Sequence, residues 1–560
     1  MTTHSREGIT RWPAELEDYY LKTGVWEGRT IQSFITDTAE RLPDKEAYFD
    51  ATNNVRFTYR ELIEHADHAA AKFREVGLRQ DDRVILAMPN GWQFVLVLLG
   101  CLRAGIIPVM ALPSHRRYEL SAIGEKAEAR AIFCADESRG FDYQGLADEL
   151  REAVPTLEWV FIAGETHAPN FDLDALLLGR TATREQLAEL DGIDIAGTDP
   201  ALFLLSGGTT GIPKMITRTH NDYVYNMKKC AEVAELEEDS VYLATMPVSH
   251  NFPLACPGVL GAFYVGAKAV TLKSPNPEKT FPVINAEKVT ITAVVPAVAQ
   301  RWIEYKEENA TGLLGSLRAL QVGGSRMPDS VAVKVEPVLG CTLQQVFGMA
   351  EGLINMTRLD DDANVICTTQ GRPVSEFDEI RIVDENFNDV TEGQSGEIIT
   401  RGPYTPQGYY ASPEANERSF REGGWYCPGD VVELGVGGNL IVHGRNKDII
   451  NRGGEKISAE EIESMVYQIP GVSLAAVVAM PDEVYGERIC LYAVVSREQG
   501  LTLEEIRGHL LDIGIAQFKV PEKLVLVDEL PMTKIDKIDK KALRTDIAER
   551  LAKEPQHSLS

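Results

Sequence analysis

A glycine-rich segment at residues 206–214, with the sequence SGGTTGIPK, carries the densest group of residue types that could bind phosphate. Glycines let a backbone approach a ligand closely, and successive N–H groups can then wrap a phosphate. The segment is not a Walker A loop, because Lys214 follows Pro213 and no serine or threonine succeeds it. The alternative is a glycine-rich surface turn. The density of hydroxyl, glycine and lysine residues favours a phosphate loop made of Ser206, Gly207, Gly208, Thr209, Thr210, Gly211 and Lys214.

Three later segments place charged residues beside glycines or turns. Residues 348–351 read GMAE, residues 425–430 read WYCPGD, and residues 444–448 read GRNKD. Taken alone, Glu351 would be interpreted as a solvated glutamate, and the Pro-Gly-Asp of the second segment as a turn. Their order behind the glycine-rich segment gives them more weight than each has by itself.

In this order the segments resemble those of the acyl-adenylate-forming superfamily of acyl-CoA synthetases, peptide-synthetase adenylation domains and luciferases, and the resemblance covers nearly the whole chain. It implies that Glu351 holds Mg²⁺, which prefers one or two carboxylates together with phosphate oxygens. It also implies that Asp430 accepts hydrogen bonds from two ribose hydroxyls and that Lys447 is the hinge of a domain rotation. The family usually has threonine where this chain has Pro428, which leaves the Asp430 assignment standing. Outside the glycine-rich segment, the resemblance assigns to ATP the residues Gly324, Val346, Asp430 and Arg445.

A lysine-rich block at residues 531–540, PMTKIDKIDK, resembles the segment that carries the family's catalytic lysine, which aligns with Lys537. The family usually has glycine before this lysine, and this chain has Asp536. A negative neighbour would keep Lys537 protonated, which suits the neutralisation of charge on the acid's carboxylate and the α-phosphate. Lys534 is the second candidate, and a solvated charged tail is the alternative for the block alone. The resemblance also assigns the loop at Gly453 and Gly454 to the incoming thiol.

Residues 247–254, PVSHNFPL, resemble the acid-binding segment of aryl-acid adenylating enzymes from siderophore pathways, and residues 218–222 and 345–353 match the same subgroup. The resemblance implies salicylate or 2,3-dihydroxybenzoate as the acid. Asn251 can bond an ortho hydroxyl and the carboxylate of the acid. Phe252, Gly323 and Gly324 would form flat walls around its ring. The alternative for His250 and Asn251 is a satisfied buried polar pair. The predicted acid site comprises His250, Asn251, Phe252, Gly323 and Gly324, and the predicted catalytic residues are Lys537, His250 and Glu351.

Two further positions of the acid site, Cys256 and Ile354, bear on the ring's substitution. Dihydroxybenzoate enzymes tend to have a small hydroxyl residue at the first position and valine at the second. A thiol donates weakly and behaves as a small hydrophobe, and isoleucine narrows the wall. A buried 3-hydroxyl without a partner would lose about 1–3 kcal/mol. The sequence therefore favours salicylate over 2,3-dihydroxybenzoate.

The elements that must position these residues alternate between short apolar runs and helix-like stretches, which predicts an α/β fold: a large N-terminal domain of sheets flanked by helices, and a small mobile α+β C-terminal domain. We expect a core domain for ATP and the aryl acid at residues 1–445 and a lid with the catalytic lysine at residues 446–560. The predicted strands are residues 84–88, 106–110, 201–205, 269–272, 291–295, 343–346, 439–443, 474–480 and 489–495, and helices are predicted over residues 92–103 and from residue 458.

Composition narrows the function classes. The 560 residues carry a net charge of −28, which argues against a nucleic-acid partner. No apolar run is long enough to span a membrane, and no secretory signal is visible. The eight cysteines form no C-x-x-C pair, so we expect reduced thiols and a cytoplasmic protein.

The expected reaction has two halves: an aryl carboxylate attacks the α-phosphate of MgATP and releases pyrophosphate, and the acyl group then passes to a phosphopantetheine thiol. The acceptor is an aryl carrier protein in the first hypothesis and free CoA in the second. The third hypothesis is a non-catalytic nucleotide-binding regulator, against which Lys214, Glu351, Asp430 and Lys537 argue.

Overall fold

The chain divides into two compact units in the computed structural model, which describes residues 6–553 apart from 139, 180, 207–212, 310–313, 325, 328, 385, 392, 446–448, 496–499 and 532–537. Unit 1 comprises residues 1–113, 121–206 and 214–444, and unit 2 comprises residues 114–120, 207–213 and 445–560. The predicted site residues that lie outside the described part of the chain are Gly207, Gly208, Thr209, Thr210, Gly211, Lys447 and Lys537, together with the side chain of Arg445.

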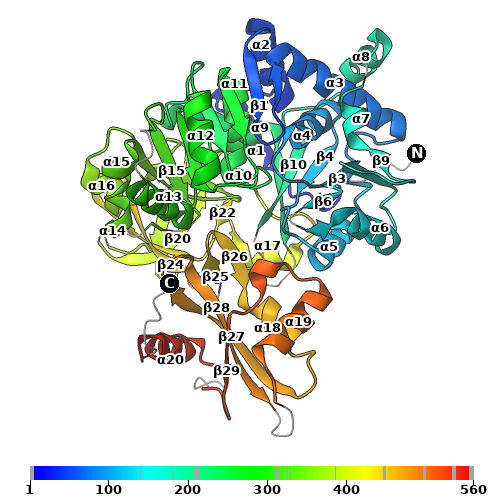
Figure 1. Ribbon diagram of the computed structural model, residues 1–560. Helices are drawn as coiled ribbons and strands as arrows, with labels where there is room; N and C mark the ends of the chain where they lie inside the picture. The colour runs from blue at the N-terminus through cyan, green and yellow to red at the C-terminus, as the bar shows by residue number, and fades with distance from the viewer. Residues whose placement is uncertain are drawn as a thin grey trace. The chain divides into compact units, whose positions relative to one another are not determined.

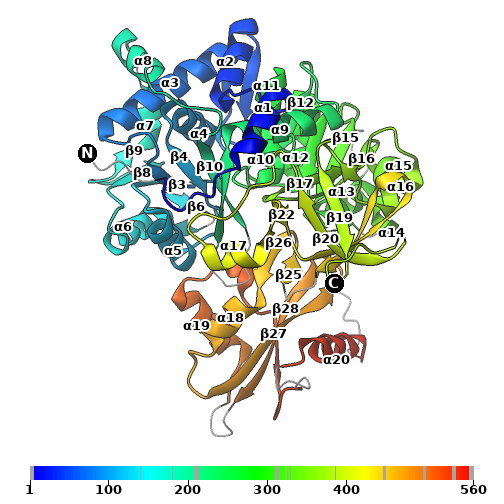
Figure 2. The same cartoon turned by 180° about the vertical axis from the view of Figure 1, so that it is seen from behind.

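A nine-stranded sheet forms the centre of one half of unit 1. Its six middle strands run parallel, with antiparallel strands at the edges. Alternate residues of each middle strand face opposite cores: Leu243 faces α12, α13 and α15, whereas Tyr242 faces α2, α9, α10 and α11. Figures 1 and 2 show the sheet between these two helix layers. The strand order is β18 (Arg372–Pro373), β17 (Gly352–Met356), β16 (Thr342–Met349), β15 (Ala319–Gly323), β14 (Ile291–Val294), β12 (Val241–Ala244), β13 (Lys268–Thr271), β1 (Glu46–Asp50), β2 (Val55–Thr58), and the helices are α12 (Pro277–Glu287), α13 (Pro296–Glu308), α15 (Val335–Leu339), α2 (Ile31–Arg41), α9 (His220–Val233), α10 (Asn251–Ala255) and α11 (Gly258–Val265).

A seven-stranded, mainly parallel sheet forms the other half, and its edge strand β11 pairs antiparallel with β10. Its middle strands are buried on both faces, as expected for a parallel sheet covered by helices. The strand order is β11 (Lys214–Thr219), β10 (Pro200–Ser206), β4 (Ile107–Met110), β3 (Arg83–Ala87), β5 (Ala131–Ala135), β8 (Trp159–Ala163), β9 (Phe171–Asp172), and the flanking helices include α3 (Tyr59–Val76), α4 (Trp92–Ala104), α6 (Tyr143–Ala153) and α7 (Leu173–Leu177).

A third sheet of unit 1 is antiparallel and carries the 425–430 segment in its strands. It consists of β21 (Phe420–Arg421), β22 (Trp425–Tyr426), β20 (Ser395–Arg401), β23 (Asp430–Leu434) and β24 (Leu440–Arg445), with β19 (Glu379–Val383) paired to β20. The other helices are α1 (Ala14–Lys22), α5 (Arg117–Ala127), α8 (Arg184–Asp191), α14 (Asp329–Ala332), α16 (Ala363–Thr368) and α17 (Pro413–Ser419), with a short strand pair β6 (Glu137–Ser138) and β7 (Phe141–Asp142).

Unit 2 is an α+β structure around a five-stranded sheet. Successive residues of the long strands β27 and β28 face opposite sides of the sheet. Val477 faces the core beneath α18 and α19, and Val478 faces the core beneath α20. The elements are β25 (Ile449–Arg452), β26 (Glu455–Ser458), α18 (Ala459–Val466), β27 (Val472–Asp482), β28 (Gly486–Val495), α19 (Leu503–Ile513), β29 (Lys523–Leu526) and α20 (Lys540–Lys553).

The predicted α/β fold with a large N-terminal part and a small C-terminal one is confirmed. Among the helices of the described residues, none combines the length and apolar character that crossing a membrane requires.

Candidate functional site

The strands on either side of the glycine-rich segment pair antiparallel, and Ser206, the last residue of β10, is the direct cross-strand partner of Lys214, the first residue of β11. The two ends of the predicted phosphate loop are therefore held together by the strand ladder. The Lys214 ammonium lies 4.5 Å from the centre of the Tyr409 ring, in cation–π contact. A bridge between Ile216 and Tyr409 and a hydrogen bond from the Tyr410 amide to the Met215 carbonyl (2.8 Å) bind the 409–410 segment to this strand pair.

Glu351 stands at the turn between β16 and β17 and is 6% exposed. The Tyr409 hydroxyl donates to Glu351 Oε1 (2.9 Å) and lies 3.1 Å from the Tyr426 hydroxyl. Burial and the neighbouring carboxylate raise the pKa of Tyr409 well above its usual value, so that its hydroxyl stays a donor. Tyr409 thus contacts Lys214 with its ring and Glu351 with its hydroxyl, which places the predicted phosphate and metal residues beside each other.

Asp430 begins β23, is 6% exposed, and follows Gly429, whose φ of 80° lies in the left-handed region. Tyr426 belongs to the same motif and reaches Tyr409 through its hydroxyl. The predicted ribose segment is therefore linked to the Glu351 turn by two tyrosines. Neither tyrosine was predicted to take part in the site.

Arg218 is fully buried beneath this turn and pairs with Asp222 at 2.7 Å. Its guanidinium donates to the Ala350 carbonyl (3.0 Å) and to the Tyr404 carbonyl (3.3 Å). Hydrogen bonds from a charged donor are among the stronger ones in proteins. Arg218 therefore fixes the backbone immediately before Glu351.

Asn251 begins α10 and is 5% exposed. Its Oδ1 accepts a hydrogen bond from the Tyr223 hydroxyl (2.8 Å), and its Nδ2 donates to Cys256 Sγ (3.3 Å). The structure thus brings together two predicted acid-site residues, Asn251 and Cys256, and adds Tyr223, which was not predicted. The neighbouring His250 is exposed and caps α10, with its Nδ1 accepting from the Phe252 amide (3.3 Å), so that the two residues are not a buried pair.

Gly323 ends β15, opposite Val346 of β16. A Cβ atom at this position would lie 2.8 Å from the Val346 carbonyl oxygen and 3.2 Å from two atoms of the Phe252 ring. The absence of a side chain at Gly323 lets the Phe252 ring lie against the sheet, where the ring and the backbone form a flat wall. Gly324 continues the chain with a φ of 89°, a conformation that favours glycine.

Ile354 is buried in β17 opposite Gly348, and its amide donates to the Tyr404 hydroxyl (3.3 Å). Arg445 is the last residue of β24, which belongs to the third, antiparallel sheet. Gly453 and Gly454 belong to unit 2, where they form a two-residue turn between β25 and β26 with φ values of 58° and 94°. Positive φ at both central residues is typical of a type I′ hairpin turn.

A magnesium ion fits this site when part of its coordination comes from phosphate. The described residues contain no group of three or more His, Cys, Asp or Glu side chains that could hold a metal. Glu351 offers one buried carboxylate, which is the hard oxygen ligand that Mg²⁺ prefers, usually with substrate phosphates.

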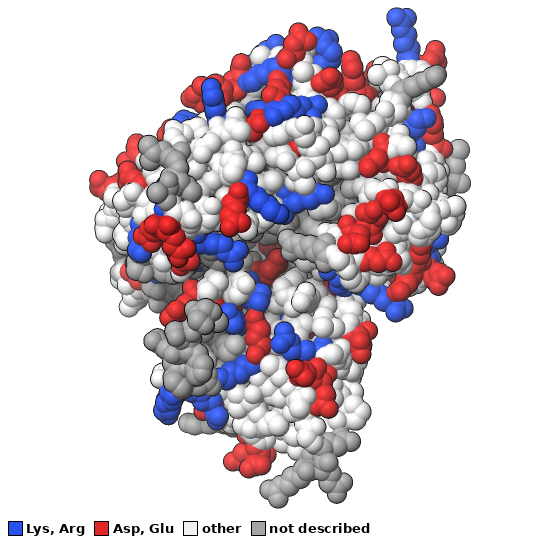
Figure 3. All heavy atoms as spheres, in the orientation of Figure 1, with Lys and Arg blue, Asp and Glu red and all other residues white. Residues whose placement is uncertain are grey.

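The face of the molecule seen in Figure 3 has acidic and basic side chains interspersed, and its described atoms form no continuous basic patch.

Comparison with known protein families assigns the chain. A model described as AMP-binding enzyme matches residues 35–410, and a model described as AMP-binding enzyme C-terminal domain matches residues 461–537. The chain belongs to the AMP-binding enzyme family. The prediction of an adenylate-forming enzyme is thereby confirmed.

Individual relatives of this AMP-binding enzyme are similar over almost their whole length. A Streptomyces protein named salicylyl-CoA synthase / salicylate adenylyltransferase is 49% identical over 541 residues, 96% of this chain and 98% of the relative. The 2,3-dihydroxybenzoate-AMP ligase of Bacillus subtilis is 43% identical over 547 residues, 97% of this chain and 98% of the relative. The apo structure of Mycobacterium smegmatis MbtA matches with a TM-score of 0.74 and 43% identity, over 96% of this chain and 98% of that one.

Proposed function

We propose that the enzyme activates an ortho-hydroxy aryl carboxylic acid with ATP, forming the aryl adenylate and pyrophosphate, and then passes the acyl group to a phosphopantetheine thiol. The observation that carries this proposal is the buried Asn251 amide beside the Phe252–Gly323 wall, in the same unit as the Lys214–Tyr409–Glu351 cluster. An amide beside a flat apolar wall suits a planar acid with a polar substituent, and the cluster suits a nucleotide triphosphate.

The first half-reaction depends mainly on positioning and charge neutralisation, because phosphoryl centres need little covalent help from side chains. In our proposal Lys214 and the glycine-rich loop hold the phosphates, Asp430 and Arg445 hold the ribose, and Lys537 neutralises the attacking carboxylate. Glu351 would hold Mg²⁺ together with phosphate oxygens, and the ion would supply positive charge there. The Tyr409 hydrogen bond orients the Glu351 carboxylate for this task.

The names of the two relatives support the choice of acid, since salicylate and 2,3-dihydroxybenzoate share a carboxylate and a 2-hydroxyl and differ at position 3. Salicylate is our choice because Cys256 lies within hydrogen-bonding distance of Asn251 and is a poor partner for a 3-hydroxyl. Mass-spectrometric detection of the adenylate tests the proposal directly. We expect aryl-AMP from salicylate and ATP, and no adenylate from hexanoate; the reverse result would contradict it.

The acceptor in our proposal is a phosphopantetheine thiol, a group that both carrier proteins and CoA contain. Of the two, we favour a carrier protein. Free CoA is a second candidate, which the name of the Streptomyces relative supports. Transfer of radiolabelled salicylate to a holo aryl carrier protein and to CoA, at equal thiol concentration, separates the two. No disulfide joins any of the eight cysteines, all of which lie in the described part of the chain; reduced thiols are typical of a reducing compartment, and we place the enzyme in the cytoplasm.

A further inference from the structure

We infer that the Tyr223 hydroxyl is a positioning group that fixes the orientation of the Asn251 amide and thereby makes the enzyme select acids with an ortho hydroxyl. This inference rests on the proposed function and deepens it, because it explains how a fully buried side chain behind Asn251 sets the class of acid. Tyr223 is at most a positioning residue, since it acts through Asn251.

Both ends of the Asn251 amide have distinct partners. The carbonyl oxygen accepts from the Tyr223 hydroxyl at 2.8 Å, and the amide nitrogen donates to Cys256 Sγ at 3.3 Å. Of the two contacts, the one to the hydroxyl is the stronger, because a thiol is a weak partner. The orientation of the amide therefore depends mainly on Tyr223.

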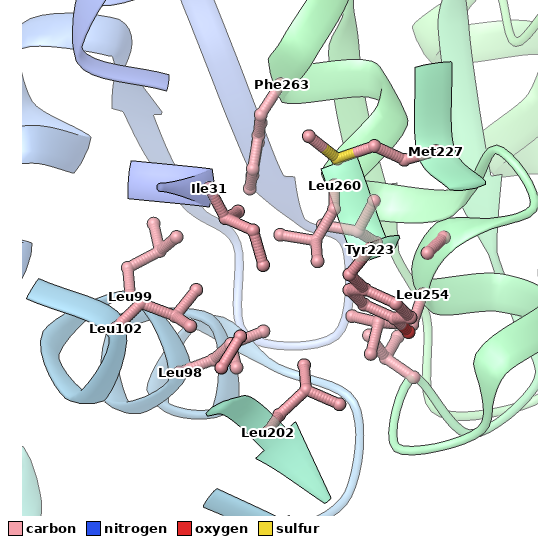
Figure 4. Packing of buried hydrophobic residues seen from close by; sticks show 14 of the residues in the cluster. Ile31, Leu98, Leu99, Leu102, Leu202, Tyr223, Met227, Leu254, Leu260 and Phe263 are labelled. Atoms are coloured by element: carbon pink, nitrogen blue, oxygen red, sulfur yellow. The ribbon is translucent and has the colours of Figure 1, made fainter. Parts of the chain in front are cut away.

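Tyr223 is itself held rigidly. Its side chain is fully buried on α9, and Figure 4 shows it among Met227, Leu254 and Leu260. The Arg218 guanidinium lies 4.7 Å from the centre of its ring. Burial raises the pKa of Tyr223 well above its usual value, so that the phenol keeps its proton throughout the working pH range. A rigid, permanently protonated phenol donates a hydrogen bond more readily than it accepts one, so it favours the orientation in which the carbonyl oxygen of the neighbouring amide faces it.

The orientation matters because an amide has one accepting and one donating end. With one lone pair and one N–H already used, Asn251 keeps one accepting and one donating position for a ligand. A phenolic hydroxyl on the acid can both donate and accept. An aromatic amino group mainly donates, and a ring hydrogen does neither. A fixed amide can therefore discriminate salicylate from anthranilate and benzoate, whereas an amide free to flip discriminates less.

The test compares Tyr223→Phe with Tyr225→Phe. Both residues are buried on α9 and both hydroxyls bond a side chain, Asn251 Oδ1 at 2.8 Å for Tyr223 and Ser375 Oγ at 2.7 Å for Tyr225. The readout is the ratio of kcat/KM for salicylate to that for benzoate and for anthranilate, measured by acid-dependent pyrophosphate exchange. We expect Tyr223→Phe to lower both ratios about five- to tenfold through KM for salicylate, with KM for ATP unchanged. Tyr225→Phe should leave the ratios within about twofold of the wild type.

A second variant tests the inference without altering Tyr223. Cys256→Ala removes the thiol and leaves the phenol in place, so it should lower the salicylate-to-benzoate ratio by less than Tyr223→Phe does. A larger loss of the ratio in Cys256→Ala than in Tyr223→Phe would mean that the thiol orients the amide, and would overturn the inference. An unchanged ratio in Tyr223→Phe would overturn it as well. In either case the wild type would still activate salicylate, whereas absence of any aryl-acid-dependent exchange by the wild type would remove the proposed function itself.

A double-mutant comparison separates positioning from a general loss of stability. Within an Asn251→Ala background, Tyr223→Phe should change neither acid ratio further, because the amide through which it acts is gone. A further fall in that background would show that Tyr223 acts by another route and would contradict the inference.

Discussion

Cys256 and Ile354 are the residues of the proposed acid site that differ from those expected for a dihydroxybenzoate pocket. We predict that Cys256→Ser with Ile354→Val shifts preference toward 2,3-dihydroxybenzoate several-fold, because a hydroxyl replaces the thiol and the wall recedes by one methylene. The measurement is the ratio of kcat/KM for the two acids in the wild type and the double mutant. A wild type that already prefers 2,3-dihydroxybenzoate would refute the choice of salicylate.

Asp378 gives the stability of unit 1 a pH dependence. The carboxyl group is buried, accepts from the Tyr404 hydroxyl (2.5 Å), and has its pKa raised by burial to about 8. Because the folded state holds this proton more tightly than the unfolded state, its contribution to stability is full below about pH 4 and is lost as the pH rises toward 8. We predict that Asp378→Asn raises the Tm by several degrees at pH 8 and by little at pH 5. Asp384→Asn, which alters an exposed carboxylate, is the control. A Tm difference between Asp378→Asn and the wild type that does not change with pH would contradict the raised pKa of Asp378.

Residues in contiguous motifs could be predicted, and their supporting partners could not. Lys214 and Asp430 stand beside glycines in recognisable order along the chain. Tyr409, which contacts Lys214 and Glu351, lies 58 residues from Glu351 in a segment without a local pattern. Tyr223 and Asn251 are likewise joined only by the packing of α9 against α10. Long-range contacts of this kind depend on the tertiary structure, which single-sequence patterns do not specify.

At the level of elements, the junction of β15 with the proposed acid site depends on Gly323. We predict that Gly323→Ala raises KM for the acid at least tenfold, because the added methyl group would meet the Val346 carbonyl oxygen at 2.8 Å and the Phe252 ring at 3.2 Å. Gly315→Ala is the matched control, since none of the residues that the structure describes lies within 4 Å of a Cβ atom there. Steady-state kinetics with varied salicylate provide the measurement. Equal KM values for the two variants would show that Gly323 does not shape the site.

Apolar runs predicted the centres of the strands but not their ends. The run at residues 343–346 predicted a strand that the structure extends to Thr342–Met349. The extra residues include Gly348, which strand propensity disfavours, and they are held by antiparallel pairing with β17. This extension brings the chain to the Glu351 turn. Pairing with a neighbouring strand therefore decided what local composition could not.

On the scale of the whole molecule, our proposal has two half-reactions served by two units and therefore needs a hinge, which the family resemblance assigns to Lys447. We predict that Lys447→Pro leaves adenylate formation within about threefold of the wild type and reduces thioester formation by at least tenfold, because a hinge must absorb a large backbone change. Supplying pre-formed salicyl-adenylate to the variant isolates the second half-reaction. Equal losses in both halves would contradict a rotation about Lys447.

The central claim, ATP-dependent activation of an ortho-hydroxy aryl acid, is tested most directly by salicylate-dependent exchange of labelled pyrophosphate into ATP, in the wild type and in Lys537→Ala. We predict exchange that requires salicylate and Mg²⁺, is far weaker with benzoate, and falls about 10²–10³-fold in the variant, because a cation is removed from the developing transition state. A severe loss of pyrophosphate exchange in Lys534→Ala, together with only a mild loss in Lys537→Ala, would assign the catalytic role to Lys534 instead. A wild type that exchanges pyrophosphate equally well with hexanoate, or with no acid added, would contradict the account.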